Sequence, residues 1–299
     1  MLLHSLLGAG AGEKFLTTHA FIMWCCVVAR VRLGLAQFEA GRSGIESGER
    51  LRRLLSRYRV EADIIVLPEY GNVYPAGLRA AEVRARAENP KDSPFIRFLE
   101  EISSEYTAVI VSGFLERSGD CAYSSIVMVE PGKEVQVVYR KTVLFDALGV
   151  RESKSLCRGE QPPPVLEVRG VRVGFIVCFE LRFPELARSL ALRGAELVAV
   201  PAAWYRGNLK EEHLLVTARS RALENTVYLA VASMTGPHFT GRSILVDPMG
   251  VVRLDLGSEP GYAEVDVDLD YINEVRKQLP LLELQPRAYE IYTRALRRD

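Results

Sequence analysis

Cysteine and histidine are scarce in this chain of 299 residues, and neither follows a metal-binding or disulfide pattern. The five cysteines form no Cys-x-x-Cys pair and are scattered at Cys25, Cys26, Cys121, Cys157 and Cys178. An odd number at such wide spacing argues against a disulfide framework, and the four histidines lack the spacing of zinc ligands. We therefore expect reduced thiols, a cytoplasmic protein and no structural metal site.

Net charge and long apolar runs are also absent. The 38 Lys and Arg residues balance the 38 Asp and Glu residues, so the chain lacks the basic excess on which general nucleic-acid binding depends. The apolar run at 21–29 falls far short of the roughly 20 residues that a membrane-spanning helix needs, and no longer run follows it. The first thirty residues also lack the basic start and unbroken apolar centre of a secretory signal. Binding to nucleic acid or to a membrane is therefore not expected.

Three segments differ in their patterning. Residues 1–30 are interpreted as a loosely attached N-terminal extension, or as a mis-assigned start with Met23 as the true one. Residues 31–270 are expected to form one domain, because no low-complexity linker divides them. Residues 271–299 are expected to form a C-terminal helix and an apolar tail that contacts a second subunit.

Strand and helix patterns alternate between residues 31 and 278. Apolar runs such as 62–68 and 171–177 predict buried strands. A helix is predicted over 93–106, with Ser93 as its cap and Pro94 at its first position. Because several strands are joined by hairpin signals, the pattern favours an α/β fold with a mixed sheet, or with two stacked sheets and helices outside.

Three polar residues follow three apolar strand patterns. Glu69 ends the first, Lys141 the second and Cys178 the third, and strand ends are where α/β folds gather reactive groups. A carboxylate at an apolar edge gains a raised pKa and can transfer protons near neutral pH. A lysine beside a cysteine favours the thiolate and can hold an oxyanion. Taken singly, each residue is more often a surface charge or a core thiol, so the joint pattern carries the argument.

The joint pattern resembles the nitrilase, or carbon–nitrogen hydrolase, superfamily. The matching motifs are Leu67-Pro-Glu-Tyr70, the stretch 139–145 (Tyr-Arg-Lys-Thr-Val-Leu-Phe), and the stretch 174–185 around Cys178. They occur in the family's order, with Lys141 72 residues after Glu69 and Cys178 37 residues after Lys141. The segment from 276 to 289 is similar to the branch that contains omega-amidase-like and related amide hydrolases.

The resemblance implies a four-layer αββα sandwich with a Glu-Lys-Cys triad. In this sequence Cys178 matches the nucleophile, Glu69 the general base and acid, and Lys141 the lysine that stabilises the intermediate. Glu152 matches a second pocket glutamate, and the backbone N–H of Phe179 would complete the oxyanion site. Because the triad supplies nucleophile, proton transfer and charge stabilisation, no metal or organic cofactor is needed.

Further residues are candidates for the substrate pocket or its support. The candidate pocket residues are Tyr70, Phe145, Glu152, Trp204 and Tyr205. Arg182 matches a family position that is interpreted as bracing the loop after the nucleophile. Ser124 and the pair Phe179-Glu180 stand where the family usually has Asn and Tyr-Asp, which affects specificity rather than the triad.

The resemblance implies hydrolysis of a non-peptide C–N bond in a small-molecule amide, through a cysteine thioester, giving a carboxylic acid and ammonia. N-carbamoyl amides or nitriles are alternative substrates for the same triad, and the acyl acceptor can be water or an amine. A non-catalytic interaction protein on the same fold is the competing class. Because relatives commonly pair and the last segment is apolar, we expect a homodimer or a higher even-numbered assembly.

Overall fold

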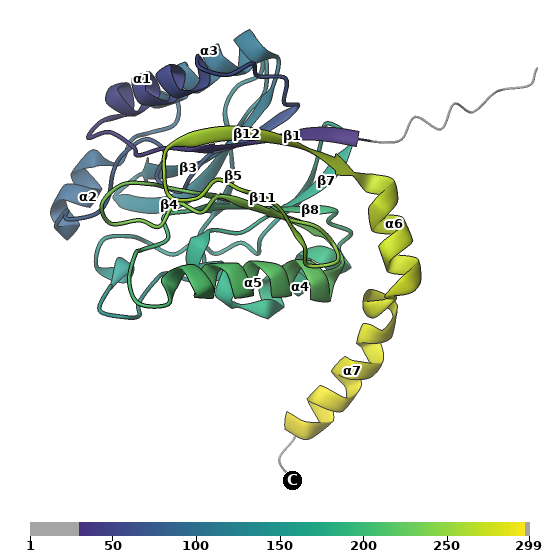
Figure 1. Cartoon of the computed structure of the whole chain (residues 1–299). Coiled ribbons are helices and arrows are strands. Elements are labelled where there is room, and N and C mark those ends of the chain that lie inside the picture. The colour runs from purple at the N-terminus through teal and green to yellow at the C-terminus, as the bar shows by residue number, and fades with distance from the viewer. Residues whose placement is uncertain (1–29, 297–299) are drawn as a thin grey trace, which may run out of the picture.

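Two β-sheets lie face to face between outer layers of helices in the computed structural model, which describes residues 30–296 (Figure 1). The expected N-terminal extension, the alternative start at Met23, and both Cys25 and Cys26 lie outside the described residues. Between residues 30 and 296, no helix combines the length and the apolar character that crossing a lipid bilayer requires.

The first sheet contains six strands in the spatial order β12-β1-β2-β3-β4-β5. In that order, the strands are Gly261–Asp268, Arg30–Gln37, Ile64–Val66, Val109–Ser118, Cys121–Val129 and Gln136–Arg140. The central strands β1, β2 and β3 run parallel, whereas β12, β4 and β5 pair antiparallel with their neighbours. The sheet is therefore mixed, as the hairpin signals predicted.

The second sheet repeats this plan with the order β11-β10-β9-β8-β7-β6. In that order, the strands are Val252–Asp255, Ile244–Val246, Tyr228–Ser233, Leu197–Ala202, Val171–Phe175 and Val165–Val168. Strands β7, β8 and β9 run parallel, and the three remaining strands pair antiparallel. Each half of the chain thus contributes a parallel centre whose carboxyl-terminal strand ends can carry reactive side chains.

Four of the helices in the described part of the chain cover the outer faces of the two sheets. The helix bounds are α1 Gly44–Leu55, α2 Ala80–Arg86, α3 Pro94–Tyr106, α4 Pro184–Leu192, α5 Lys210–Asn225, α6 Leu269–Gln278 and α7 Leu281–Leu296. Helices α1 and α3 lie on the first sheet, and α4 and α5 lie on the second (Figure 1). The predicted four-layer αββα sandwich is confirmed, and so is the Ser93 cap, whose side chain accepts a hydrogen bond from the Ile96 N–H.

The alternation of side chains along β2 shows how one strand serves two cores. Ile64 and Val66 point into the core between the two sheets, whereas Ile65 points into the core beneath α1 and α3. All three side chains are buried because both faces of the strand are covered. This double burial fixes the register of β2 and hence the position of Glu69 beyond its end.

The C-terminal segment differs from the expected tail. Helix α6 forms where a helix was predicted, but residues 281–296 continue as a second helix, α7, that extends away from the body of the domain (Figure 1). No α7 residue is buried, and Leu284, Tyr289 and Tyr292 are each more than half exposed. The apolar periodicity of this segment is that of an amphipathic helix, which the tail interpretation did not take into account.

One expectation about the cysteines is wrong. Cys121, at the start of β4, forms a disulfide with Cys157, and their Cα atoms lie 5.8 Å apart. Spacing along the sequence could not reveal the pair, because 36 residues separate the two cysteines and the fold alone brings them together. The bond fastens the segment after Glu152 to the first sheet, so the prediction of reduced thiols fails for these two residues.

Candidate active site

Glu69, Lys141 and Cys178 all lie just beyond the ends of strands, as their sequence positions predicted. Glu69 follows β2, Lys141 directly follows β5, and Cys178 opens a short 3-10 helix after β7. The backbone of Cys178 is left-handed, with φ at 42°, and so is that of Tyr70, at 55°. Non-glycine residues adopt this conformation at a cost, and such positions cluster at functional sites.

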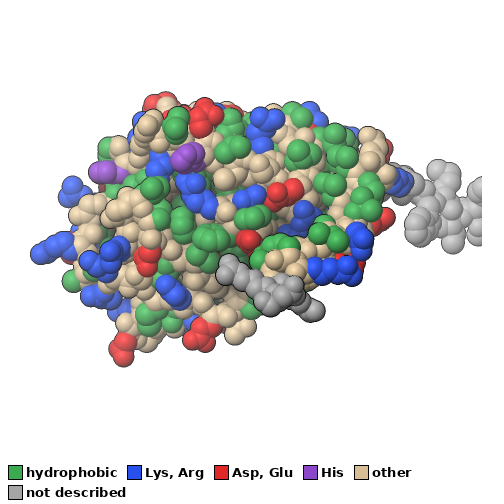
Figure 2. Space-filling view, turned by 90° about the horizontal axis from the view of Figure 1, so that it is seen from below, with side chains coloured by type: hydrophobic (Ala, Val, Ile, Leu, Met, Phe, Trp, Pro, Cys, Tyr) green, Lys and Arg blue, Asp and Glu red, His purple; other side chains and the backbone are tan. Residues whose placement is uncertain are grey.

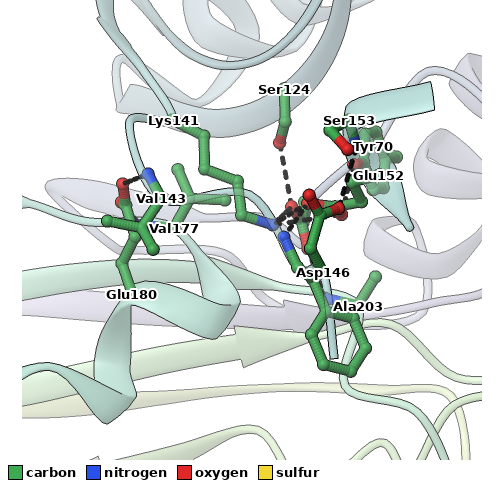
Figure 3. A network of polar contacts seen from close by, with 12 residues as sticks. Tyr70, Ser124, Lys141, Val143, Asp146, Glu152, Ser153, Val177, Glu180 and Ala203 are labelled. Carbon is green, nitrogen blue, oxygen red and sulfur yellow. Dashed lines mark hydrogen bonds and ion pairs between the residues drawn. The ribbon is translucent and has the colours of Figure 1, made fainter. Parts of the chain in front are cut away.

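The Lys141 ammonium lies between two carboxylates in the interior. Its Nζ atom is 3.0 Å from Glu69 Oε1 and 2.9 Å from Glu152 Oε2, and the lysine side chain is 1% exposed. Glu152 is itself held by the Tyr70 hydroxyl, which donates at 3.0 Å, and by the Phe145 N–H, at 2.7 Å (Figure 3). Burial alone would lower the pKa of Lys141, but Glu152 and Glu69 raise it well above its usual range. The lysine is therefore a fixed positive charge.

Both oxygens of Glu69 accept hydrogen bonds. Ser124 Oγ donates to Oε1 at 2.8 Å beside the Lys141 contact, and the Ala203 N–H donates to Oε2 at 3.1 Å. Burial raises the pKa of Glu69, while the Lys141 charge acts in the opposite direction. A carboxyl group with a raised pKa and a fixed orientation is suited to take up and return protons near neutral pH.

Cys178 is buried next to this carboxylate. Burial raises the pKa of its thiol well above the usual range, and Glu69 raises it further, while Lys141 and the backbone N–H of Ala203 oppose the change. The thiol is therefore protonated at neutral pH and needs a base to become a nucleophile. Glu69 lines the same cavity and can serve as that base.

The cavity at these residues has a volume of about 410 Å³. Its polar lining includes Glu69, Tyr70, Glu152 and Cys178, together with Arg151, Lys154 and Ser155, and Phe145 and Tyr205 line it as well. The apolar lining includes Pro75, Leu78, Val83 and Phe239. This volume lies within the range of small-molecule sites.

The other two predicted site residues lie elsewhere. Trp204 and Phe179 do not line this cavity but line a second, smaller one that also contains Cys178. Trp204 is buried, and its indole N–H donates to the backbone oxygen of Lys210 at 2.8 Å. The Phe179 ring packs on Phe145, with their centroids 4.8 Å apart. Both residues therefore lie near Cys178 but outside the main cavity.

Two contacts to Glu69 were not predicted from the sequence. Ser124 stands out in the sequence only as a departure from the family pattern, although its hydroxyl orients the carboxylate. The Ala203 contact is made by the backbone, so the residue type gave no signal. Strand β8 ends at Ala202 and therefore delivers the next N–H, that of Ala203, to the site.

Glu180 is a second polar centre, located behind the nucleophile. Its Oε1 accepts hydrogen bonds from the Tyr139 and Thr142 hydroxyls and from the Thr142 and Val143 N–H groups, and its Oε2 accepts one from the Val177 N–H. The side chain is completely buried. Figure 3 shows Glu180 beside Val143 and Val177. The carboxylate joins the segment after β5 to the segment before the candidate nucleophile, so it positions two triad candidates relative to each other.

We expect Glu180→Gln to destabilise the fold measurably. An amide NH₂ in place of one oxygen would face N–H donors and leave them unpaired, at a cost of about 1–3 kcal/mol for each buried group. The midpoint of denaturant unfolding should therefore fall. Glu185→Gln is the matched control, because Glu185 is exposed and its side chain makes no hydrogen bond within residues 30–296. Equal midpoints for the two variants would contradict the role of Glu180.

Comparisons with known proteins agree on one family. The sequence model of a family described as Carbon-nitrogen hydrolase matches residues 38–277. A deaminated glutathione amidase from Escherichia coli O157:H7 is 39% identical over 161 residues, which cover 54% of this chain and 61% of that protein, less than two thirds of its length. Hydrolase MT0498 from Mycobacterium tuberculosis is 31% identical over 277 residues, which cover 85% of this chain and 95% of that protein.

Solved structures give the same result. An amidase from Nesterenkonia sp. matches with a TM-score of 0.66 and 29% identity, and the match covers 83% of this chain and 94% of that one. In a variant of the amidase from Nesterenkonia sp. AN1, the acetamide moiety of fluoroacetamide is covalently added at the active-site cysteine.

Proposed function

This chain belongs to the carbon–nitrogen hydrolase family and is an enzyme of that family, and on this basis we propose that it hydrolyses a small-molecule amide through a thioester on Cys178. The observation that carries the proposal is the buried Lys141 ammonium, held between Glu69 and Glu152 beside a buried thiol. The covalent adduct on the cysteine of the Nesterenkonia amidase variant shows that the cysteine of that protein is a nucleophile, which supports the same role for Cys178.

The first half of the reaction forms the thioester. Glu69 takes the proton of the Cys178 thiol as the sulfur attacks the amide carbonyl carbon. The Lys141 ammonium and the Phe179 N–H hold the oxyanion of the tetrahedral intermediate. Glu69 then gives its proton to the nitrogen, the C–N bond breaks, and ammonia leaves while the acyl group stays on sulfur.

The second half releases the acid. Water takes the position that ammonia has left, and Glu69 removes its proton as the oxygen attacks the thioester carbonyl. The same donors hold the second oxyanion, the C–S bond breaks, and the proton returns to sulfur. Lys141 remains charged throughout, because its two carboxylate neighbours raise its pKa. Glu152 keeps the ammonium in place.

A substrate panel tests the proposal. The purified protein is incubated with amides, N-carbamoyl compounds and nitriles, and ammonia is measured. We expect release from amides, in keeping with the names of the amidase relatives. Release from nitriles or carbamoyl compounds alone would overturn the amide assignment, and no release from any compound would favour a non-catalytic role.

We also propose a homodimer or a higher even-numbered assembly. Small residues on α4 and α5, including Ala187, Ala218 and Ala222, are buried within the protomer and are not available for contact with a second subunit. The large apolar side chains that α4 and α5 do expose are Leu192, Val216 and Leu223, and α7 exposes several more. Figure 2 views the molecule from the side of α4 and α5 and shows hydrophobic side chains at several places on this face.

Light scattering at micromolar protein concentration checks the assembly. We expect a mass of at least twice the 33.4 kDa of one chain. The double variant Tyr289→Glu/Tyr292→Glu places charges on the exposed face of α7 and should shift the mass toward one chain. The matched control Arg287→Glu changes a charge on the same helix and should leave the mass unchanged. A fully active protein of 33.4 kDa would contradict the proposal.

A further inference from the structure

The disulfide between Cys121 and Cys157 ties the segment that carries Glu152 to strand β4. Cys121 opens β4, and Cys157 lies just after Glu152 at the end of the segment 142–157. Beside the disulfide, the Cys157 N–H donates to the backbone oxygen of Ala122 at 2.8 Å. The end of this segment is therefore attached to β4 by one covalent bond and one hydrogen bond.

Strand β4 also positions two members of the candidate triad. The Lys141 N–H donates to the backbone oxygen of Ser124 at 2.8 Å, and the Ser124 hydroxyl donates to the Glu69 carboxylate at 2.8 Å. The second carboxylate at the ammonium, that of Glu152, lies on the segment that the disulfide fastens. Both carboxylates that flank the ammonium are thus linked to the same strand, one through a hydroxyl and the other through a covalent bond.

The path from the disulfide to Glu152 runs through one short turn. Leu156 is buried beside Cys157, and its N–H donates to the backbone oxygen of Glu152 at 2.9 Å. The Ser155 N–H donates to the same oxygen at 2.8 Å. These two hydrogen bonds close the 3-10 turn Glu152–Lys154. A displacement of Cys157 is therefore transmitted to Glu152 instead of being absorbed between them.

The rest of this segment is held weakly. Most residues between 146 and 154 are exposed, and Leu148 is exposed by 69%. Arg84 donates a hydrogen bond to the segment at 2.9 Å, but this contact is itself exposed. Segments with few buried contacts and solvent-exposed hydrogen bonds open locally at a low cost in free energy. The disulfide therefore limits an opening that would carry Glu152 away from Lys141.

We propose that the Cys121–Cys157 disulfide positions Glu152 for the reaction, so that reduction of the disulfide lowers the rate of amide hydrolysis. The proposal rests on the proposed function and adds a redox control to it. Both cysteines are partly exposed, so a small dithiol can reach them. Cys178 is a thiol both before and after the reduction.

Reduction proceeds by thiol–disulfide exchange. A thiolate of the dithiol attacks one cysteine sulfur, the S–S bond breaks, and the other cysteine leaves as a thiolate that takes up a proton. The second thiolate of the reductant then displaces the first cysteine from the mixed disulfide. Two electrons and two protons have passed to the cysteine pair, and the dithiol ends as a cyclic disulfide.

Kinetics of the oxidised and reduced protein test the proposal. Amide hydrolysis is measured before and after treatment with dithiothreitol, at a temperature well below the unfolding midpoint of both states. We expect kcat to fall by about 10-fold, the scale of one hydrogen bond to a charged group, because Glu152 no longer holds Lys141 in place. Reoxidation should restore the rate. Peptide mass mapping that finds Cys121 and Cys157 as separate thiols in protein treated with oxidised glutathione would overturn the proposal.

Two double variants separate positioning from a purely structural role. Cys121→Ser/Cys157→Ser should have the lower kcat and should not respond to dithiothreitol. Cys25→Ser/Cys26→Ser is the matched control, because it also removes two cysteines, and it should keep the wild-type rate and response. If the first variant unfolds more readily but keeps the wild-type kcat, the positioning role is wrong. Loss of the response in the control would also overturn the proposal, by moving the redox effect to Cys25 or Cys26.

Hydrogen exchange reads the same segment without any amide hydrolysis. We expect backbone amides of 142–156 to exchange faster after reduction, whereas those of 236–241, which contribute Phe239 to the same cavity, should be unchanged. Equal exchange in the two states would overturn the proposal even if amides are hydrolysed. Faster exchange confined to 142–156 in a protein that releases no ammonia would support the hold of the disulfide on Glu152 while contradicting the proposed hydrolysis.

Discussion

Replacing Cys178 by alanine is expected to reduce ammonia release by roughly 10⁶-fold, the scale seen when the nucleophile of a hydrolytic triad is removed. The charged groups that act on the thiol, Glu69, Glu152 and Lys141, cannot take over the role of the sulfur, because none of them carries a thiol or a hydroxyl. The fold should persist, since the alanine side chain is smaller than the one it replaces and Cys178 makes no disulfide. Thermal unfolding of the variant should confirm this.

Mass spectrometry gives the direct readout for the same prediction. With a slowly turned-over amide, the wild type should carry the acyl group on the peptide that contains Cys178, and Cys178→Ala should carry none. The double variant Cys121→Ser/Cys157→Ser is the control, because it removes the disulfide and keeps the thiol at Cys178. An alanine variant that releases ammonia at the wild-type rate would exclude the thioester mechanism.

Glu69→Gln is expected to lower kcat/KM by about 10²–10⁴-fold, because glutamine keeps the shape but cannot transfer a proton. In the wild type, activity should fall as the pH drops through the pKa of Glu69, since only the ionised form can accept the thiol proton. Burial raises that pKa, so the fall should occur above the range of an exposed glutamate. The pH profile of the variant should lack this fall in activity at acidic pH, which is the acidic limb of the profile.

A milder change separates proton transfer from orientation. Ser124→Ala removes one hydrogen bond to the Glu69 carboxylate and leaves the proton acceptor in place. Its kcat/KM should fall by only about 10-fold, the scale of one hydrogen bond, and its acidic limb should remain. If Glu69→Gln kept the wild-type pH profile, another group would have to be the base.

The sequence predicted the positions of the reactive groups better than their surroundings. Apolar runs that stop at a polar residue placed Glu69, Lys141 and Cys178 at strand ends, because burial on both faces of a strand leaves a local pattern. Their convergence came from the family resemblance, since nothing local shows that β5 of one sheet and β7 of the other end at the same place.

Long-range contacts account for what the sequence did not reveal. The Cys121–Cys157 disulfide and the hydrogen bonds of Glu180 depend on segments that meet only in the folded chain. Arg182 looked like a structural residue in its motif, and the contact of its guanidinium with the Trp204 ring becomes apparent only in the folded chain. Helix α7 was missed for a different reason: Pro280 marks a boundary, but the chain resumes a helix directly after it.

The pairing of β12 with β1 affects how the chain folds while it is being synthesised. β1 ends at Gln37 and its partner strand begins at Gly261, so one edge of β1 has no partner until most of the chain has left the ribosome. At about 5–20 residues per second, synthesis of the intervening chain takes roughly 10–45 s. An unpaired strand edge can template association with other chains during that interval. A polypeptide truncated before Gly261 would therefore leave this edge of β1 permanently unpaired. Cellular proteases would have to remove such a product.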